Sequence, residues 1–472
     1  MDFTQVRFVV FVVLLSIAYR FCPARRRVAL LAAVSYLFYC TWSVTMALML
    51  VITAAAVFWA ARALESASER KRRWIMIWLV AGLVGLLAIF KSAGFLRGIL
   101  HYGLLMPLGL SYYTFKLISY VLDVYWRTMP AESDFLRFAA YVAFFPQIVA
   151  GPIQRSQSFL KQLYDPKPAS FDTATLGLQR ILLGFFKKLV VADGLAVLVN
   201  FVYGNVHSSG TPMLVGYYVY PFQLYADFSG LTDIAIGAAL LLGIESPENF
   251  SAPFAAPNPT EFWRRWHITL SSWLMDYVYT PMRMATRTIG NIGLVLSLFI
   301  TMVLIGIWHG FRWGFVVFGL VHAVYLSVDA LTSRARKKYY KKHPAADRVT
   351  NWFGPLVTFH LAATGFVVFR AASLQDALYM LEHLMNGLSA PSPEFLRLVE
   401  MSVVGIGAGI VGYVLIEIAD YLRRHNQHNE LLCGLPRWGR WSVYSCTITT
   451  AIIMVLLMFD TVRYSPFIYE IF

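Results

Sequence analysis

The chain is 472 residues long, 58% hydrophobic and only 14% charged, with a mean hydropathy of +0.59. Soluble proteins average about 45–50% apolar and about 25% charged residues, so this composition excludes an ordinary soluble domain and indicates a polytopic membrane protein. The net charge of +14 comes from short basic clusters between apolar segments, as in cytoplasmic loops. We therefore expect the lipid bilayer, and no nucleic acid, as a partner.

Apolar segments long enough to cross a membrane recur along the whole chain. They lie near residues 6–22, 74–91, 104–126, 178–203, 213–243, 291–308, 312–330, 352–370, 402–420 and 443–460. The segment 28–62 is too long for one crossing of about 20 residues and is predicted to form two helices separated near 41–43. The sequence thus predicts an all-α polytopic fold of roughly 11–12 crossings, with re-entrant or interfacial helices in 126–177 and 244–289.

Basic clusters predict the orientation of these crossings. The clusters lie at 25–27, 70–73, 334–342 and 423–440. Alternating crossings place all four on one face, which the positive-inside rule makes cytoplasmic. The same alternation puts His309 near the external end of its crossing. Because glycines stand at 306, 310 and 314, we expect this crossing to be broken or re-entrant, which would place His309 deeper.

The segment Gly-Ile-Trp-His-Gly at 306–310 is the first candidate for chemistry. An ionisable side chain at membrane depth is costly, and by default it is a functional candidate. The His309 imidazole either hydrogen-bonds a neighbouring helix or acts as a general base, which typically contributes about 10²–10⁴-fold to a rate. For His322, in the next crossing, the structural interpretation is favoured. The four cysteines show no metal-ligand spacing, so no metal site is predicted.

The segment 257–281 carries the second histidine, His267. Asn258 is predicted to cap a helix in which Pro259 is the first residue, and Glu261 is expected to pair with Arg265 four positions later. One interpretation is an interfacial anchoring helix with snorkelling arginines. The other is a docking site for a thioester or phosphate near the cytoplasmic mouth. Its donor-binding candidates are Trp263, Arg264 and Arg265.

Two further segments are too polar or too irregular for a lipid-facing helix. Residues 144–155 contain two prolines and a glycine in an apolar setting, and 222–234 contain several polar side chains that must face protein or water. The segment 144–155 either forms a structural kink or lines an internal tunnel. The polar side chains of 222–234 either hold a histidine or satisfy one another. The candidates for tunnel lining are Gln147, Gln154, Arg155, Asp227, Ser229, Asp233 and Trp308.

Six motifs occur in order along the chain. They are PQIVAGPIQR (146–155), YADFSGLTDIAIG (225–237), PENFSAPF (247–254), PTEFWRRWHITLSSWL (259–274), GIWHG (306–310) and FRAASLQDAL (369–378). Together they resemble the membrane-bound O-acyltransferase superfamily. The resemblance is closest to its bacterial polysaccharide branch, which includes alginate and peptidoglycan O-acetyltransferases and teichoic-acid D-alanyltransferases. It covers the chain from about residue 100 onward.

The resemblance implies a helical ring around a tunnel that links the cytoplasm to the outer leaflet. It implies that His309 is the catalytic residue and that His267 is a second polar residue toward the cytoplasm. We expect a single membrane domain over 1–472. Its N-terminal helices lie in 1–100, its motif-bearing core in 101–330, and further helices and an FxYxxF tail in 331–472.

The tail resembles the C-terminal motif of a small partner peptide of the teichoic-acid system, whose tyrosine is proposed to carry the acyl group. Tyr469 is thus a candidate acyl relay, although a terminal aromatic cluster is also typical of an interfacial anchor. A phenol has a pKa near 10, so it needs a base such as His309 to become a nucleophile.

The expected function is O-acyl transfer in the bacterial inner membrane, with acetyl-CoA or another acyl thioester as donor substrate and no bound cofactor. The implied partners are a periplasmic SGNH-type acetyltransferase or the polysaccharide acceptor itself. Two alternatives stay open at this stage: D-alanyl transfer to teichoic acid from a carrier protein, and a transporter gated by a histidine. The transporter is less favoured because the sequence shows no symmetric halves.

Overall fold

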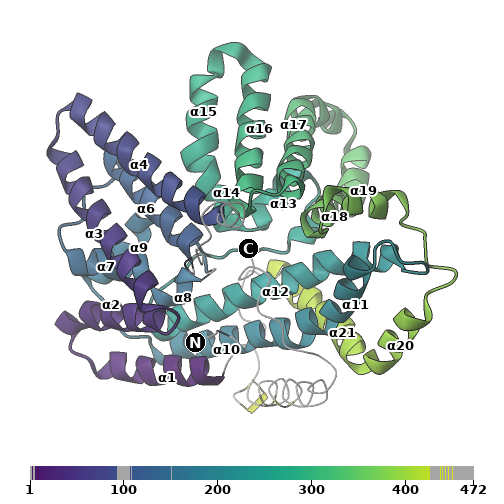
Figure 1. Cartoon of the computed structure of the whole chain (residues 1–472), viewed down its shortest axis with the longest axis horizontal. Helices are drawn as coiled ribbons and strands as arrows, with labels where there is room; N and C mark the ends of the chain where they lie inside the picture. Colours follow the sequence, from purple (N-terminus) through teal and green to yellow (C-terminus); the bar gives the residue numbers. More distant parts are fainter. Residues whose placement is uncertain are drawn as a thin grey trace, which may run out of the picture. The chain divides into compact units, whose positions relative to one another are not determined.

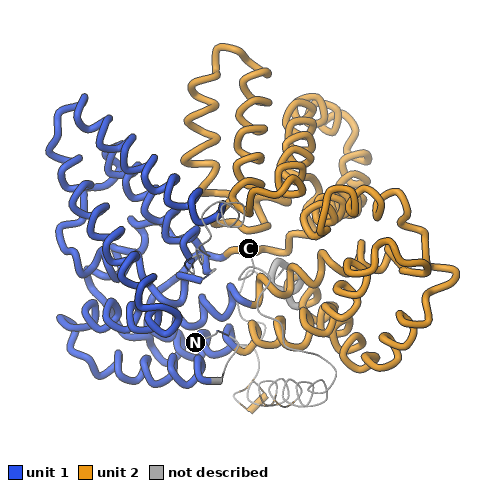
Figure 2. The backbone as a smooth tube through the Cα atoms, in the orientation of Figure 1, with its two compact units in different colours: residues 1–181, 231–248 blue, residues 182–230, 249–472 orange. Residues whose placement is uncertain are grey.

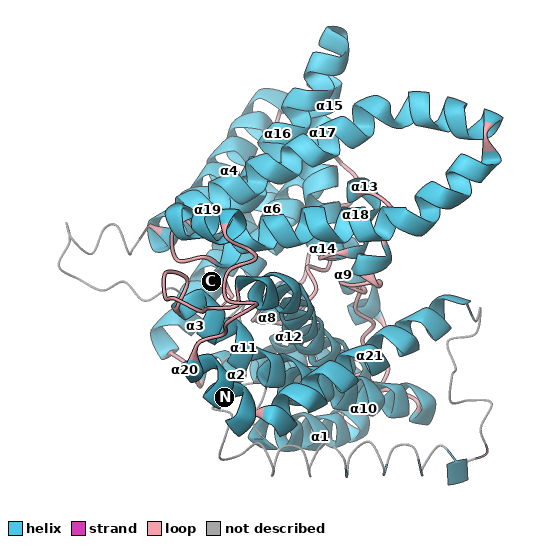
Figure 3. Ribbon diagram, turned by 90° about the vertical axis from the view of Figure 1, so that its right-hand side faces the viewer, coloured by secondary structure: helices cyan, strands magenta, loops and turns pink. Residues whose placement is uncertain are grey.

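The computed structural model describes residues 3, 6–92, 107, 109–149, 151–425 and isolated positions between 436 and 449. All regular secondary structure in these residues is helical, which confirms the all-α part of the predicted fold (Figures 1 and 3). The α-helices up to residue 241 are α1 (Val6–Phe21), α2 (Ala24–Cys40), α3 (Val44–Ser66), α4 (Glu69–Lys91), α6 (Leu110–Tyr125), α7 (Phe135–Ala143), α8 (Phe145–Ile148), α9 (Ser156–Tyr164), α10 (Phe171–Phe185), α11 (Asp193–Gly204) and α12 (Met213–Leu241).

The second half of the chain continues in the same way. Its α-helices are α13 (Pro259–Arg265), α14 (Ile268–Leu274), α15 (Thr280–Ala285), α16 (Gly290–His309), α17 (Trp313–Lys342), α18 (Pro344–Arg370), α19 (Leu374–Glu382), α20 (Pro393–Met401) and α21 (Val403–His425). Two short π-helices, η1 (Phe186–Ala192) and η3 (Met275–Tyr279), and two 3₁₀ turns, η2 (Pro253–Ala255) and η4 (Arg287–Ile289), connect them.

Within the described residues, six helices are long and apolar enough to cross a membrane. They are Val44–Ser66, Glu69–Lys91, Met213–Leu241, Arg287–His309, Trp313–Lys342 and Pro344–Arg370. The bent pair α20 and α21 makes seven if it forms one crossing. The predicted segments at α1, α2 and α6 form helices of 16 or 17 residues, which are shorter than the roughly 20 residues of a straight crossing. Residues 443–460 lie largely outside the described part, so the total of 11–12 crossings stays a prediction.

The predicted separation within 28–62 is confirmed. Helix α2 ends at Cys40, and α3 begins after Ser43, whose hydroxyl oxygen accepts a hydrogen bond from the backbone N–H of Met46 at 3.3 Å. Such a cap satisfies one of the free N–H groups at a helix start. A local polar residue therefore determines where one long apolar run becomes two helices.

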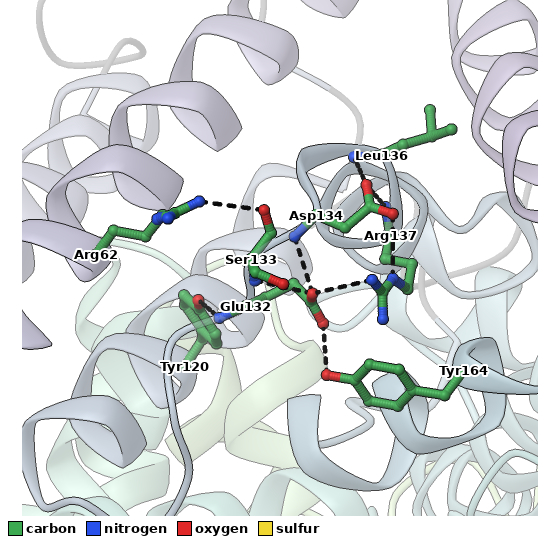
Figure 4. A network of polar contacts seen from close by, with 8 residues as sticks. All are labelled: Arg62, Tyr120, Glu132, Ser133, Asp134, Leu136, Arg137 and Tyr164. Atoms are coloured by element: carbon green, nitrogen blue, oxygen red, sulfur yellow. Dashed lines mark hydrogen bonds and ion pairs between the residues drawn. The ribbon is translucent and has the colours of Figure 1, made fainter.

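The described chain divides into two compact units, shown in blue and orange in Figure 2. The first comprises residues 1–181 and 231–248. In this unit Glu132, in the connection between α6 and α7, accepts hydrogen bonds from the backbone N–H groups of Ser133 and Asp134 and from the Tyr164 hydroxyl (Figure 4). Arg137 lies 3.8 Å from the same carboxylate. These contacts satisfy a carboxylate that is only 2% exposed.

The second unit comprises residues 182–230 and 249–472. In it, α17 packs against both α16 and α18 (Figure 1). A Cβ atom at Gly306 would lie only 2.1 Å from the carbonyl oxygen of Phe315, and one at Gly319 would lie 2.4 Å from that of Met302. Glycine at these two positions therefore lets the backbones of α16 and α17 approach each other closely.

The break expected before His309 is not present, and this prediction was wrong. Helix α16 runs without interruption from Gly290 to His309, and the chain leaves the helix only at Gly310. The glycine at 306 serves close packing of α16 on α17 rather than a re-entrant turn. His309 is thus the last residue of an unbroken helix that is long and apolar enough to cross a membrane.

We predict that Gly306→Ala destabilises the protein, because its Cβ would overlap the backbone of α17. Overpacking of this kind typically costs about 1–3 kcal/mol. Gly82→Ala is the matched control, since no atom lies within 4 Å of a Cβ there and alanine favours a helix by up to about 1 kcal/mol. Thermal unfolding in detergent, followed by size-exclusion chromatography, measures the difference. Equal midpoints for the two variants would contradict the close approach of α16 and α17.

Candidate functional site

One narrow cavity in the second unit is lined by both predicted histidines. Its lining residues are Leu224, Trp263, Trp266, His267, Leu270, Ile305, His309, Phe318, Phe366 and Phe369. They come from α12, α13, α14, α16, α17 and α18 and from the junction of α13 with α14. Its free space is about that of one water molecule. The fold thus brings His267 and His309 to a single apolar chamber.

Aromatic rings surround His309 on several sides. Its imidazole centroid lies 4.6 Å from Trp308, 4.8 Å from Phe369 and 5.9 Å from Phe315. The Phe369 ring meets it edge to face, at an interplanar angle of 90°, which is a preferred geometry for aromatic pairs. His309 is 6% exposed. The surroundings therefore hold the imidazole in one place while shielding it from water.

The Trp308 ring lies near both histidines. Its centroid lies 4.6 Å from the His309 centroid and 6.2 Å from the His267 centroid. A second ring, that of Phe228 on α12, meets His267 edge to face at 4.8 Å. The two imidazoles are therefore separated by little more than one indole, which is a suitable spacing for two groups that act on one small substrate.

His267 stands at a sharp turn between α13 and α14. Its backbone dihedrals, φ 44° and ψ 53°, are left-handed, a conformation that non-glycine residues adopt at a cost of roughly 1–3 kcal/mol. The predicted helix over 257–281 is therefore divided at this point. Such strain persists only where the surrounding structure holds it, and it is frequent at functional sites.

Asn249 fixes the orientation and the tautomer of His267. Its Oδ1 atom accepts hydrogen bonds from the backbone N–H of Thr269 at 3.2 Å and from the Thr269 hydroxyl at 2.8 Å, and it lies 3.0 Å from His267 Nδ1. Because a backbone N–H can only donate, the Asn249 atom must be the carbonyl oxygen, and Nδ1 must carry the proton. Nε2 of His267 is then the nitrogen with the lone pair.

Burial keeps His267 uncharged. The ring is 1% exposed, and removal from water lowers the pKa of His267 to about 3, because the charged form loses its hydration. At physiological pH the imidazole is neutral, and its Nε2 atom can accept a proton or a hydrogen bond. This is the electronic state that a general base or an orienting acceptor requires.

The donor-binding candidates follow the predicted local structure. The Asn258 side chain accepts a hydrogen bond from the Glu261 backbone N–H at 2.9 Å, and Pro259 is the first residue of α13, which confirms the predicted cap. Glu261 pairs with Arg264 at 2.7 Å and with Arg265 at 3.7 Å. The Arg264 side chain is 69% exposed, so it is accessible to a soluble ligand.

Trp263, by contrast, points inward and lines the cavity. Its indole N–H donates to Nδ1 of His322 at 3.3 Å. His322 therefore joins α17 to α13 by a hydrogen bond, and the structural interpretation of this histidine is confirmed.

The polar residues of α12 are neutralised by basic partners. Asp227 and Asp193 both lie 2.9 Å from Lys188 Nζ, in a buried group within the second unit. Asp233 lies 2.7 Å from Arg180, within the first unit. Ser229 is buried on the same helix. In the sequence, Lys187 and Lys188 interrupt an apolar run, which indicates that buried acidic partners are needed. The sequence alone does not show which acidic residues these are.

Gln147 and Gln154 pair with each other in the first unit. Gln147 Nε2 donates to Gln154 Oε1 at 2.6 Å and to the Ser246 hydroxyl at 2.8 Å, and Lys116 donates to Gln147 Oε1 at 3.1 Å. Arg155 belongs to the same unit. None of the six polar candidates from Gln147 to Asp233 is among the side chains that line the cavity described above, and their place in a tunnel stays a prediction.

Two predicted features are not tested by the described residues. Tyr469 lies outside the described residues. A continuous passage from the chamber to either face of the membrane also stays a prediction. Among the residues that the sequence reasoning missed, Asn249 is the most consequential, and its only signal was its place between two prolines in the PENFSAPF motif.

Comparison with known proteins agrees with these features. Residues 130–364 match the family model described as MBOAT, membrane-bound O-acyltransferase family. The chain is 32% identical over 423 residues to a probable alginate O-acetylase AlgI of Pseudomonas aeruginosa, covering 85% of this chain and 78% of that protein. It is 31% identical over 421 residues to a peptidoglycan O-acetyltransferase of Helicobacter pylori, covering 79% and 78%.

A third relative is described by a different activity. The chain is 32% identical over 285 residues to a teichoic acid D-alanyltransferase of Bacillus subtilis, covering 57% of this chain and 69% of that protein. The similarity to this relative thus extends over less of the chain than the similarity to the two O-acetylating relatives.

We predict that Asn249→Ala gives a mixture of His267 tautomers, because the carbonyl oxygen that accepts the Nδ1 proton is removed. Nuclear magnetic resonance of ¹⁵N-labelled histidine in nanodiscs measures this, with Nδ1–H dominant in the parent protein and a mixture of tautomers in the variant. Asn249→Asp is the control, since a carboxylate also accepts this hydrogen bond. An Nδ1–H form that stays dominant in Asn249→Ala would contradict the assignment.

Proposed function

The chain belongs to the membrane-bound O-acyltransferase family, and we propose that it transfers acetyl groups from acetyl-CoA in the cytoplasm for O-acetylation of an extracytoplasmic polysaccharide. The observation that carries this proposal is the chamber shared by His267 and His309. Its support is the similarity to relatives described as alginate and peptidoglycan O-acetylating enzymes. The bacterial inner membrane is the proposed location.

In the proposed reaction, His309 removes the proton from an acceptor hydroxyl as its oxygen attacks the thioester carbonyl. A carbon–oxygen bond forms, the carbon–sulfur bond breaks, and the proton passes from His309 to the leaving thiolate, which departs as free CoA. General-base assistance of this kind typically contributes about 10²–10⁴-fold. His267 is neutral, and its Nε2 atom accepts a hydrogen bond that orients the hydroxyl or the donor.

The lining of the chamber favours an uncharged acyl group. In the part of the chain that the structure describes, the lining side chains are aromatic or aliphatic apart from the two imidazoles. A D-alanyl group carries an ammonium ion, which would lose its hydration there without a carboxylate to compensate. An acetyl group has no such cost, so acetyl is the proposed acyl group. Analysis of the ester on the product identifies the transferred acyl group. A D-alanyl ester would show that the group is not acetyl.

The proposed orientation follows from charge. The C-terminal end of α17 carries Arg334, Arg336, Lys337, Lys338, Lys341 and Lys342, which the positive-inside rule assigns to the cytoplasm. His309 precedes the N-terminus of α17 and so belongs to the opposite end of that helix. Arg264, Arg265 and Trp263 are proposed to receive the donor, and a ring of helices to enclose a tunnel between the two faces.

The acetyl group must finally leave the enzyme on the external face. We propose that a periplasmic SGNH-type acetyltransferase, or the polysaccharide itself, receives it. Tyr469 is the proposed relay, since its phenol can accept an acyl group once a base removes its proton. Because the chamber is narrow, its aromatic walls must move apart to admit either substrate.

We predict that His309→Ala lowers acetyl transfer at least about 10²-fold, because the base is lost. The assay measures CoA thiol release and polymer acetylation by purified enzyme in liposomes. His360→Ala is the matched control, since His360 lies on α18 and does not line the chamber. Normal acetylation by His309→Ala, at equal expression, would reject the catalytic assignment.

We predict that Tyr469→Phe blocks acetyl transfer to the polymer, because the first acceptor hydroxyl is missing. For the same reason, CoA release in a short single-turnover assay is expected to fall. The variant keeps the ring and loses only the oxygen, so an anchoring role would be preserved. Full polymer acetylation by Tyr469→Phe would dismiss the relay and leave the enzyme assignment intact.

A further inference from the structure

Two arginines stand beside the His309 end of the chamber. Arg312 follows α16, and Arg370 is the last residue of α18. The Arg312 Nη2 atom donates a hydrogen bond to the carbonyl oxygen of Phe369 at 2.9 Å. The ring of Phe369 lies 4.8 Å from that of His309. The two cationic side chains are therefore one residue away from the wall of the chamber.

The contacts of both guanidinium ions are with uncharged groups. Arg312 lies over the Phe315 ring, 4.6 Å from its centroid. Arg370 lies over the Tyr203 ring at 5.5 Å and donates to Asn200 Oδ1 at 3.0 Å. Among the ion pairs of the described residues, neither arginine has a carboxylate partner. Asp227 also acts electrostatically on the nearby Tyr220 hydroxyl, but its carboxylate is already paired with Lys188.

Three buried polar atoms in the same group have no hydrogen-bond partner among the described residues. They are the hydroxyls of Tyr203 and Tyr220 and the Nε atom of Arg312. The two tyrosine rings lie 5.5 Å apart, and both arginines lie near enough to act electrostatically on the Tyr220 hydroxyl. Buried donors are nearly always paired in proteins. A cluster of such donors next to two cations therefore calls for an acceptor that the described residues do not supply.

Membrane topology does not account for these charges. The basic cluster that marks the cytoplasmic side lies at the C-terminal end of the 30-residue helix α17, whereas Arg312 directly precedes its N-terminal end. Arg312 and Arg370 thus belong to the external end, where basic residues are depleted. Capping of the last carbonyls of α18 explains the contact from Arg312 to Phe369, but it leaves the two phenols and the Nε atom unexplained.

We propose that Arg312, Arg370, Tyr203 and Tyr220 form a binding site for an anionic group of the acyl acceptor. This inference rests on the form of the proposed function in which the polysaccharide itself, rather than Tyr469, presents the hydroxyl to His309. It narrows that acceptor to a glycan that carries carboxylate or phosphate groups. Guanidinium ions bind both groups through paired N–H donors, and phenol hydroxyls add further donors. Bound there, the anion would hold a neighbouring sugar hydroxyl beside the wall that Phe369 shares with His309.

Direct binding tests this site. The enzyme in nanodiscs of zwitterionic lipid is titrated with a uronate tetrasaccharide, with its uncharged methyl ester, and with a phosphate-bearing oligosaccharide of equal length. We expect at least one charged glycan to bind about tenfold or more tightly than the ester, and to bind more weakly as salt rises. The tighter of the two identifies carboxylate or phosphate as the recognised group.

Variants distinguish binding at this site from non-specific attraction to basic residues elsewhere on the surface. Arg312→Gln and Arg370→Gln are expected to lose most of the preference for the charged glycan, and Tyr220→Phe part of it. Tyr220→Phe removes only a hydroxyl with no identified partner, so it keeps the test valid if an arginine variant misfolds. Lys341→Gln removes one charge at the other end of α17 and is expected to retain the full preference.

Equal affinity for the charged glycans and the ester would overturn the proposal, and so would a preference that survives in both arginine variants and in Tyr220→Phe. Stronger binding of a glutamate-rich peptide than of either glycan would also overturn the proposal, because it would show that the site binds an acidic protein rather than a glycan. CoA release is measured in the same samples. If the parent enzyme releases no CoA, the proposed acetyl transfer is rejected. The preference for the charged glycan over the ester is measured independently and tests only the binding site.

Discussion

The site depends on one constraint: an imidazole can act in a buried apolar chamber only if the protein fixes its tautomer and excludes competing partners. Asn249 does this for His267, because its side-chain oxygen is committed to two donors of Thr269 and to Nδ1. The left-handed backbone at His267 is the local cost of placing the ring there. A loop residue that precedes α13 in the sequence thereby determines which nitrogen of His267 can serve chemistry.

The position of His309 follows from packing of a different kind. Glycines at 306 and 319 bring the backbones of α16 and α17 together, and the chain then turns at Gly310. His309 ends its helix against the rings of Trp308 and Phe369. The same turn places Arg312 beside Phe369, so one hairpin supplies both the imidazole and a cation for the proposed acceptor site.

Sequence reasoning succeeded where the interaction is local. The cap by Asn258, the separation of α2 from α3 and the hydrogen-bonding role of His322 were all readable from residue type and spacing. It failed at Gly306, because glycine permits both a chain break and close helix packing. It also missed the contact between Asn249 and His267, since a contact across 18 residues depends on a turn that no local signal predicts.

The central claim is that acyl chemistry at His309 connects the two sides of the membrane. The most direct measurement uses sealed proteoliposomes that contain enzyme in one orientation, with radiolabelled acetyl-CoA outside and an acceptor glycan inside. The account predicts labelled acetyl ester in the lumen, released CoA outside and no label when His309 is replaced. Luminal ester that forms equally well without His309, or only after the vesicles are permeabilised, would contradict it.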